Sequence, residues 1–332
     1  MKDYAIIYNP TAAAGRIRKQ MDLVRKYLDE QYINYDLFET QHFAHAIELA
    51  LQAAKDGYRV IGAGGDGTCN EVLNGVINSQ TKALLGFIPM GTGNDIPGAI
   101  GYRPDIRRAV EIIAQGTLGR NDVGRATNAV GEQRYFLGIG SQGFDAEVTK
   151  RTNEAPKRLP GTWNYIASVV KTVFGFKKRM IRCLMDSDHY EGVCNLIAVA
   201  NGKSYGGWMY MAPRACSSDG MFHLSIPEMG TVELLGKFKK MYDRTLHPDP
   251  HLKEYCSKHI KIEMVNESDE PYLAQVDGEL IGPLPVEYEC LPLGYEFIRP
   301  SEDEAEAWFM EKYGKRFRDH QQKLKQQGIA YY

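Results

Sequence analysis

Hydrophobic positions in the first 124 residues follow two alternating patterns. Short apolar runs typical of buried strands are YAIIY (4–8), YDLFE (35–39), YRVIGA (58–63) and ALLGFIP (83–89). Between these runs, apolar residues recur at the spacing of one helix face: Ile17, Met21, Val24 and Leu28, then about 43–56, CNEVLNGVI (69–77) and DIRRAVEIIAQG (105–116). Strands that alternate with helices predict a doubly wound parallel sheet with helices on both faces.

The pattern changes after Gly124, where short apolar runs are separated by Gly, Pro and Asp, as in an antiparallel β domain. These runs are YFLGIGSQGFDAEV (135–148), CNLIAVANG (194–202), MFHLSIPEM (221–229), HIKIEMV (259–265) and AQVDGELIGPLPVEYECLPLGYEFI (274–298). Helices are expected at about 162–175, at about 231–246 and after Ser301, which forms a capping-box spacing with Glu304. We therefore expect an α/β domain, 1–124 rejoined by 292–332, and a mostly β, sandwich-like domain, 125–291.

Composition adds only broad limits. Of 332 residues, 43% are hydrophobic and 25% are charged, so the chain can bury a sizeable core, and a net charge of −2 gives no basis for nucleic-acid binding. The six cysteines form no C-x-x-C pair, and the N-terminus resembles neither a signal peptide nor a spanning helix, so we expect a cytoplasmic protein with reduced thiols. His42 and His45 lie three residues apart, but with no third ligand evident we expect no zinc site.

A glycine-rich segment, VIGAGGDGTCNEVLNG (60–75), joins the third predicted strand to a helix. Such loops bind anions through backbone N–H groups and the helix dipole, yet Asp66 would repel a phosphate unless a cation lay between them. A second glycine-bearing loop, 91–95, also follows a strand, and ligands of α/β sheets bind beyond the carboxyl ends of the strands. No G-x-x-x-x-G-K-S/T motif occurs, so a phosphate must be held without a P-loop lysine.

Four motifs occur in a fixed order: GGDGT (64–68), MGTGND (90–95), SSDGMFHL (217–224) and VDGELIG (276–282). This ordered set resembles the diacylglycerol kinase catalytic family, in particular its compact bacterial soluble lipid kinases. The resemblance runs from IIYNP near the start to about residue 300, some nine-tenths of the chain. NAD kinases also carry GGDGT, but the P-x-G-T-x-N-D element and the late D-G-E belong to the lipid kinases.

The resemblance implies an ATP- and Mg²⁺-dependent kinase that phosphorylates a hydroxyl of diacylglycerol or a related lipid. Asp66 would act with Mg²⁺ and the phosphates, and Glu279 of the late D-G-E would be the general base. The implied ATP-binding residues are Thr40, Gly64, Gly65, Asp66, Gly67, Thr68, Cys69, Asn70, Glu71 and Thr92. A separate structural Mg²⁺ would be held by Asp219 with the backbone carbonyls of Cys216 and Met221, and the other implied members of the active-site network are Asn9, Asp95 and Asp122.

Several alternatives stay open. Many relatives read G-T-x-N-D-F-x-R where this chain reads GTGNDIPGA, so the contact of the missing arginine is either supplied by Arg16 or Arg103, or lost. VDGE and SSDG are also typical of tight turns. The chain could then be a non-catalytic nucleotide- or lipid-binding regulator on the same fold, or an NAD-kinase-like enzyme that acts on a small molecule.

The implied substrate lies in a bilayer, so we expect a lipid partner met at the membrane surface and only peripheral membrane contact. The basic segments that would attract anionic lipid are KKRMIR (177–182) and the tail beyond Lys312. A homodimer is compatible with the sequence, and no nucleic-acid partner is expected.

Overall fold

The computed structural model describes residues 3–154, 161–266 and 270–327, without the side chains of 13–14, 161–166 and 174. Within this part of the chain, no helix is both long and apolar enough to cross a membrane. The N-terminal half contains four parallel strands in the order β2-β1-β3-β4. They are β1 (Tyr4–Tyr8), β2 (Tyr35–Glu39), β3 (Arg59–Gly64) and β4 (Leu85–Pro89).

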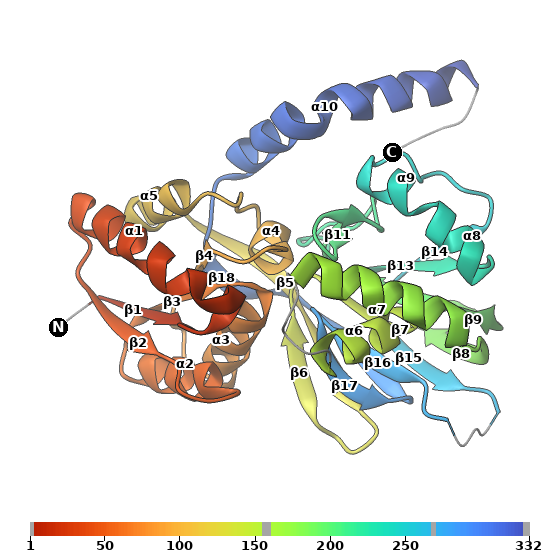
Figure 1. Cartoon of the computed structure of the whole chain (residues 1–332), viewed down its shortest axis with the longest axis horizontal. Helices are drawn as coiled ribbons and strands as arrows, with labels where there is room; N and C mark the ends of the chain where they lie inside the picture. Colours follow the sequence, from red (N-terminus) through yellow and green to blue (C-terminus); the bar gives the residue numbers. More distant parts are fainter. Residues whose placement is uncertain (1–2, 155–160, 267–269, 328–332) are drawn as a thin grey trace.

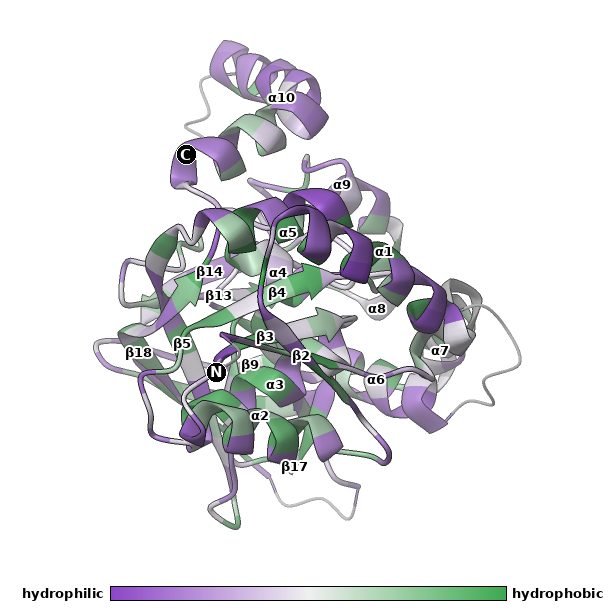
Figure 2. Cartoon of the chain, turned by 90° about the vertical axis from the view of Figure 1, so that its left-hand side faces the viewer, coloured by the Kyte–Doolittle hydropathy of each residue, from purple (hydrophilic) through white to green (hydrophobic). Residues whose placement is uncertain are grey.

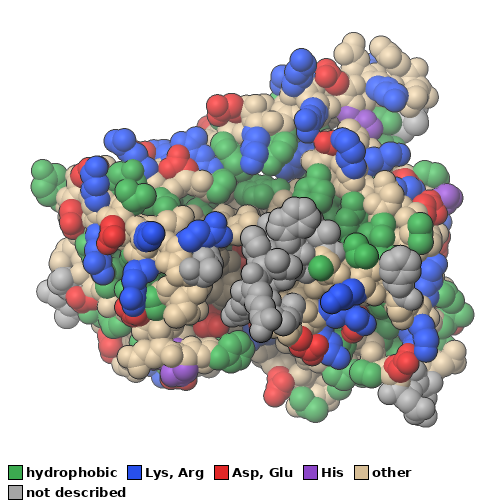
Figure 3. All heavy atoms as spheres, in the orientation of Figure 1, with side chains coloured by type: hydrophobic (Ala, Val, Ile, Leu, Met, Phe, Trp, Pro, Cys, Tyr) green, Lys and Arg blue, Asp and Glu red, His purple; other side chains and the backbone are tan. Residues whose placement is uncertain are grey.

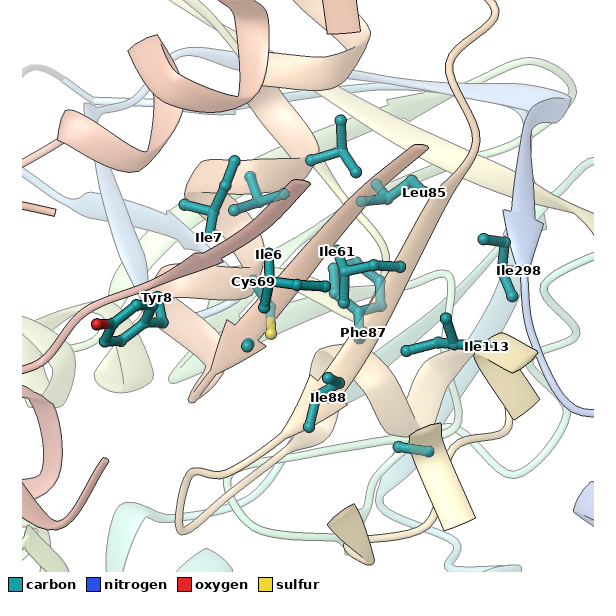
Figure 4. Packing of buried hydrophobic residues seen from close by; sticks show 14 of the residues in the cluster. Ile6, Ile7, Tyr8, Ile61, Cys69, Leu85, Phe87, Ile88, Ile113 and Ile298 are labelled. Carbon is teal, nitrogen blue, oxygen red and sulfur yellow. The ribbon is translucent and has the colours of Figure 1, made fainter. Parts of the chain in front are cut away.

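Helices cover both faces of these strands, with α1 and α5 on one side and α2 and α3 on the other (Figure 1). The helices of this half are η1 (Ala12–Gly15), α1 (Arg16–Glu30), α2 (His45–Lys55), α3 (Asp66–Asn78), α4 (Asp95–Ala99) and α5 (Ile106–Gln115). α1 buries its four predicted positions, and most of its other residues are hydrophilic (Figure 2). In the same view, β4 and α3 are largely hydrophobic. Ile6, Ile61 and Phe87 meet in the core between the layers (Figure 4). The predicted doubly wound α/β arrangement is confirmed.

The second half of the chain forms two packed, mainly antiparallel sheets. One has the order β14-β13-β10-β7-β16-β17: β7 (Ile139–Gly143), β10 (Leu196–Ala200), β13 (Phe222–Pro227), β14 (Leu252–Ser257), β16 (Leu273–Val276) and β17 (Glu279–Pro283). The other continues from β4 through β18-β15-β8-β9 and includes β5 and β6: β5 (Leu118–Asn128), β6 (Gln133–Phe136), β8 (Arg179–Met185), β9 (His189–Cys194), β15 (His259–Met264) and β18 (Val286–Ile298). Side chains of both sheets, including Ile181 and Phe222, share one apolar core, which confirms the predicted sandwich-like architecture.

Strands β5 and β18 connect the two halves. They pair along their length in antiparallel register, and Phe297 of β18 also pairs with Leu85 of β4 in parallel register. Positions 124 and 291, where the sequence pattern divides the domains, fall inside these two strands. The exact domain boundaries therefore remain predictions.

The remaining elements are α6 (Phe144–Glu154), α7 (Gly161–Gly175), β11 (Ser204–Tyr205), β12 (Met209–Tyr210), α8 (Thr231–Gly236), α9 (Phe238–Tyr242) and α10 (Glu302–Gln326). α7 confirms the helix expected at about 162–175. The single helix expected at about 231–246 is wrong, because the segment breaks at Lys237 and ends before Arg244. Gly236 weakens the helix at the break, and Arg244, with φ of 60°, is in the left-handed region that stops it.

Helix α10 begins as the capping-box spacing predicts, but only half of the box forms. Ser301 Oγ accepts the backbone N–H of Glu304 at 3.2 Å. The Glu304 carboxylate instead accepts two N–H groups of Arg108 on α5, with N–O distances of 2.6 and 2.7 Å. This bidentate pair fixes the start of α10 to the N-terminal half, from which the helix extends across the top of the molecule (Figure 1).

Candidate active site

The two glycine-bearing loops touch each other at the carboxyl ends of β3 and β4. A Cβ atom added to Gly91 would lie 2.5 Å from the Cα of Gly65, and one added to Gly64 would lie 2.9 Å from the Cβ of Thr68. Side chains at these glycines would therefore separate the loops or disturb the first turn of α3. The close packing places the N-terminus of α3, where Asp66 is the first residue, at the meeting point of both loops. This is the anion-binding position that the sequence predicts.

Asp66 and Asp95 form a pair of close carboxylates. A Cβ atom on Gly93, between them, would lie 2.6 Å from Oδ2 of Asp66 and 3.1 Å from Oδ2 of Asp95. Asp66 accepts the backbone N–H groups of Asn94 and Ile96 at 2.8 and 2.9 Å. Burial raises the pKa of both carboxyl groups, and with the added charge of Asp66 the pKa of Asp95 rises to about 6.

This carboxylate pair suits a divalent cation. Two acidic groups held together by backbone N–H donors repel each other, and a bound Mg²⁺ would relieve that repulsion with the oxygen ligands it prefers. Asp95 is held from its other side, where the N–H groups of Gly207 and Trp208 donate to it at 2.7 and 2.9 Å. The residues present therefore fit the implied metal at Asp66.

The late D-G-E segment is a tight hairpin, as one of the open interpretations predicts. Asp277 and Gly278 both have positive φ, 49° and 85°, as in a type I′ turn between β16 and β17. The hairpin also directs Glu279 toward the glycine-rich loop, because a Cβ on Gly67 would lie 3.6 Å from the Oε1 atom of Glu279. The segment can therefore form a tight turn and also supply a carboxylate to the candidate site.

Arg134, on β6, lies beside Glu279. Its guanidinium is 3.7 Å from Oε2 of Glu279 and donates to Oδ1 of Asn70 on α3 at 3.3 Å. Burial raises the pKa of Glu279, while the positive charge of Arg134 lowers it. Sequence reasoning missed this arginine, because the segment GEQRYF around it carries no motif.

Asp277 has a different environment from Glu279. Its carboxylate accepts the backbone N–H groups of Leu137, Gly138 and Ile139 at 2.9, 3.0 and 3.0 Å. These bonds tie the hairpin to the start of β7, and burial raises the pKa of Asp277 to about 7. Asp277 therefore acts as a structural tie, and Glu279 is the hairpin carboxylate that faces Gly67.

The side chains of the other predicted ATP-binding residues differ in how far they are exposed. Glu71 accepts the N–H of Ala46 at 3.2 Å, and its pKa is raised by burial and then by Glu279. Thr40 is buried at the end of β2, whereas Thr92 is exposed. Cys69 is fully buried, which raises its thiol pKa well above the usual value, so only its backbone could face a ligand.

The described contacts of Asn9 and Arg103 are with residues other than Glu279. Asn9 Oδ1 accepts the N–H and the hydroxyl of Thr11 at 3.0 and 2.9 Å, just after β1. Arg103 is 3.8 Å from Asp105, the N-cap of α5, and Arg16 begins α1. Arg134 is thus the arginine that the structure brings to the Glu279 carboxylate.

Asp122 joins the loop that contains the predicted structural metal site. Its Oδ2 accepts the N–H of Gly220 at 2.7 Å and its Oδ1 accepts that of Leu293 at 2.6 Å. In the same loop, Asp219 accepts the N–H of Met221 and is 3.0 Å from Nε2 of His223. Cys216 is exposed, with its thiol 3.4 Å from the Ser218 hydroxyl. A cation here would replace His223 as the partner of the Asp219 carboxylate.

We expect Asp219→Ala to abolish any stabilisation of the protein by Mg²⁺ at this loop, because the variant lacks the charged ligand. The measurement is the melting temperature of wild type and variant with increasing Mg²⁺. Ser218→Ala, which keeps Asp219, serves as the control and should retain the wild-type dependence. If Asp219→Ala responds to Mg²⁺ as wild type does, the cation does not bind at this loop.

The structure adds a possible third ligand to the two neighbouring histidines, while the expectation of no zinc site stays a prediction. Glu48 brings a third ligand type to His42 and His45, with all three ligand atoms within 4.8 Å of one another. The reason is helical spacing, since α2 begins at His45 and carries Glu48 one turn later on the same side. Nδ1 of His45 already accepts the N–H of Gln41 at 3.0 Å, so a metal at Nδ1 would have to displace this hydrogen bond, and a metal at Nε2 would require the other tautomer of the ring.

Comparisons with known proteins agree with this architecture. The model of the diacylglycerol kinase catalytic domain matches residues 3–126, and that of the YegS C-terminal NAD kinase beta sandwich-like domain matches residues 138–298. A diacylglycerol kinase of Staphylococcus saprophyticus is 29% identical over 301 residues, covering 90% of this chain and 95% of its own. A diacylglycerol kinase of Staphylococcus aureus is 28% identical over 298 residues, covering 90% of this chain and 92% of its own.

A solved structure gives the same picture of the fold. A Bacillus anthracis protein described provisionally as a diacylglycerol kinase matches with a TM-score of 0.73 and 22% identity, over 90% of this chain and 97% of its own. Identity at this level supports the fold alone. The two family models, in contrast, match consecutive segments that together make up most of the chain. The chain therefore belongs to the diacylglycerol kinase catalytic family, a family of lipid kinases.

Proposed function

We propose that the protein transfers the terminal phosphoryl group of ATP, with Mg²⁺, to a hydroxyl of diacylglycerol or a closely related lipid. The observation that carries the proposal is the position of Glu279, whose carboxylate faces Gly67 at the start of α3. A carboxylate next to a phosphate-binding loop is where a base must lie to accept the proton of an attacking hydroxyl.

Each part of the site has a distinct task in this reaction. The N-terminus of α3 and the touching loops at Gly65 and Gly91 would hold the phosphates through backbone N–H groups. Mg²⁺, held by Asp66 with Asp95 close by, would neutralise phosphate charge when bound. Glu279 would accept the hydroxyl proton as the new bond to phosphorus forms. Arg134 favours the ionised form of Glu279, which is the form that a general base requires.

The test is phosphoryl transfer by the purified chain. Radiolabelled ATP and Mg²⁺ are supplied with diacylglycerol in mixed micelles, or with NAD in a parallel reaction. We expect the label in phosphorylated lipid and none in NADP. Label in NADP alone would identify the NAD-kinase-like alternative, and ATP binding without label in either product would identify a non-catalytic regulator.

Membrane contact is expected to be peripheral and carried by the tail, not by KKRMIR. Three of the four cations of that segment already pair with glutamates: Lys177 and Arg179 with Glu270, and Arg182 with Glu191 and Glu263. The lysines of α10, in contrast, include exposed ones at 315, 323 and 325. We therefore propose a cytoplasmic enzyme whose basic tail meets the lipid surface.

Replacing Lys315, Lys323 and Lys325 by Gln should weaken binding to anionic vesicles, by about 1 kcal/mol for each charge that lies near the surface. Sedimentation with vesicles at low and high salt measures the effect. Lys177→Gln, which removes a paired cation, is the control and should bind as wild type does. Equal binding of wild type to neutral and anionic vesicles would contradict this account of the tail.

A further inference from the structure

Helix α10 spans the molecule above a large cleft. Beyond its attachment to α5, Arg316 pairs with Asp243 at 3.0 Å, and Nε2 of His320 lies 2.8 Å from the carbonyl of His247. These contacts fix the middle of the helix to the second half of the chain (Figure 1). The cleft beneath has a volume of about 960 Å³, within the range of small-molecule sites. α10 lies beyond both matched family ranges, the later of which ends at residue 298.

The walls of this cleft are largely apolar and aromatic. Trp308 of α10 lies edge to face on Trp208 with centroids 5.0 Å apart, and Phe309 contacts Tyr210 and Phe317 at 6.5 and 5.9 Å. The remaining wall includes the end of α4 and the segment after it, 98–101. Figure 3 shows hydrophobic side chains gathered below α10, with Lys and Arg side chains along the helix. Such walls would accept an alkyl chain.

Arg244 provides a buried positive charge in the same cleft. Its side chain is only 3% exposed, and its guanidinium carbon lies 3.7, 4.4 and 4.7 Å from the ring centroids of Tyr313, Tyr210 and Phe309. Nε of Arg244 has no hydrogen-bond partner, and no carboxylate in the described ranges forms an ion pair with this residue. The three rings and the Tyr210 hydroxyl stabilise the guanidinium, but none of them carries a negative charge, so an anionic group would be the partner that Arg244 lacks.

Charge along the cleft is unequal. Glu302 and Glu306 line the end of the cleft near the start of α10. Arg244 instead contacts Phe309 and Tyr313, which follow one to three turns later on the same helix. Lys203 and Arg214 also line the cleft. A negatively charged ligand would therefore place its charge near Arg244 and its apolar part against the aromatic wall.

We propose that this cleft binds a single-chain anionic amphiphile, with its alkyl chain along Trp208, Trp308 and Phe309 and its negative head group on Arg244. A neutral chain would leave the guanidinium without an anion, and a small inorganic anion would leave the apolar walls exposed to water. Glu279 and Gly67 are not among the residues that line the cleft, so its ligand need not be the substrate of the kinase.

Calorimetric titration of the full chain tests the site with three probes below their aggregation concentrations: decyl phosphate, decanol and inorganic phosphate. We expect decyl phosphate to bind at least tenfold more tightly than either of the others. Equal affinity for decanol would show that Arg244 plays no part in binding, and equal affinity for inorganic phosphate would show that the walls play none. Either result overturns the proposal.

Variants locate the binding in the cleft. Arg244→Gln should weaken the binding of decyl phosphate at least tenfold. Met310→Glu adds a negative charge at a half-buried cleft position, and it should weaken the binding as much without removing a buried side chain. The matched controls are Lys315→Gln, which removes an exposed cation of α10 that does not line the cleft, and Met310→Leu, and both should bind as wild type does. If Arg244→Gln does not fold, Met310→Glu decides alone, and unchanged affinity in that variant contradicts the proposal.

Discussion

Glu279→Gln is expected to lower kcat by roughly 10²–10⁴-fold, the usual contribution of a general base. The glutamine has the size of the original side chain but cannot accept the hydroxyl proton. Because the hairpin turn is formed by Asp277 and Gly278, the variant should keep its fold and its affinity for ATP. Steady-state kinetics with lipid, together with ATP titration and thermal melting, separates the loss of proton transfer from a loss of structure.

Asp277→Asn is the matched control in the same hairpin. Asp277 accepts three backbone N–H groups, so the asparagine NH₂ would face donors, and we expect a loss of about 1–3 kcal/mol in the free energy of unfolding. The folded fraction should retain turnover far above that of Glu279→Gln. If Asp277→Asn abolishes turnover while Glu279→Gln stays active, the two carboxylates have exchanged roles. If neither variant lowers turnover, the D-G-E segment is only a structural hairpin.

Asp66→Asn is expected to remove Mg²⁺-dependent turnover, by roughly a thousandfold or more, since several kcal/mol of charge stabilisation are lost with the cation. Asparagine can still accept one of the two N–H bonds from Asn94 and Ile96, so the loops should remain together with some loss of stability. Kinetics over a range of Mg²⁺ concentrations, with melting temperatures measured in parallel, checks this expectation.

The control for Asp66→Asn is Asp105→Asn, which also replaces an aspartate at a helix N-terminus. Asp105 caps α5 through the N–H of Arg108, and asparagine is an equally good N-cap. This variant should keep wild-type turnover and Mg²⁺ dependence. A wild-type kcat in purified Asp66→Asn would show that the loop carboxylate has no role with the cation.

The elements with strong periodicity could be predicted from the sequence. α1 buries the four positions that the helical spacing selects, and β1 and β4 are buried at every position, as continuous apolar runs predict. The hairpin at Asp277 follows from its Asp-Gly pair, which tolerates positive φ. Local chemistry determines each of these features, so no knowledge of distant residues is required.

Features that depend on long-range contacts could not be predicted. Arg134 reaches Glu279 only because β6 and β17 lie next to the start of α3, and no motif surrounds it. Asp95 is bonded by Gly207 and Trp208, more than one hundred residues later in the chain. The break at Lys237 escaped prediction for a different reason, because the apolar spacing of 231–246 continues through it and hides the local effect of Gly236.

The pH dependence of kcat in wild type and Glu279→Gln tests most directly whether Glu279 is the base. A base must be ionised, and burial raises the pKa of Glu279 above the usual value of 4.5. Wild-type kcat should therefore be highest above this raised pKa and fall as the pH decreases through it. The account predicts that Glu279→Gln is slow at every pH and lacks this acidic decline. An identical decline and an undiminished rate in the variant would contradict it.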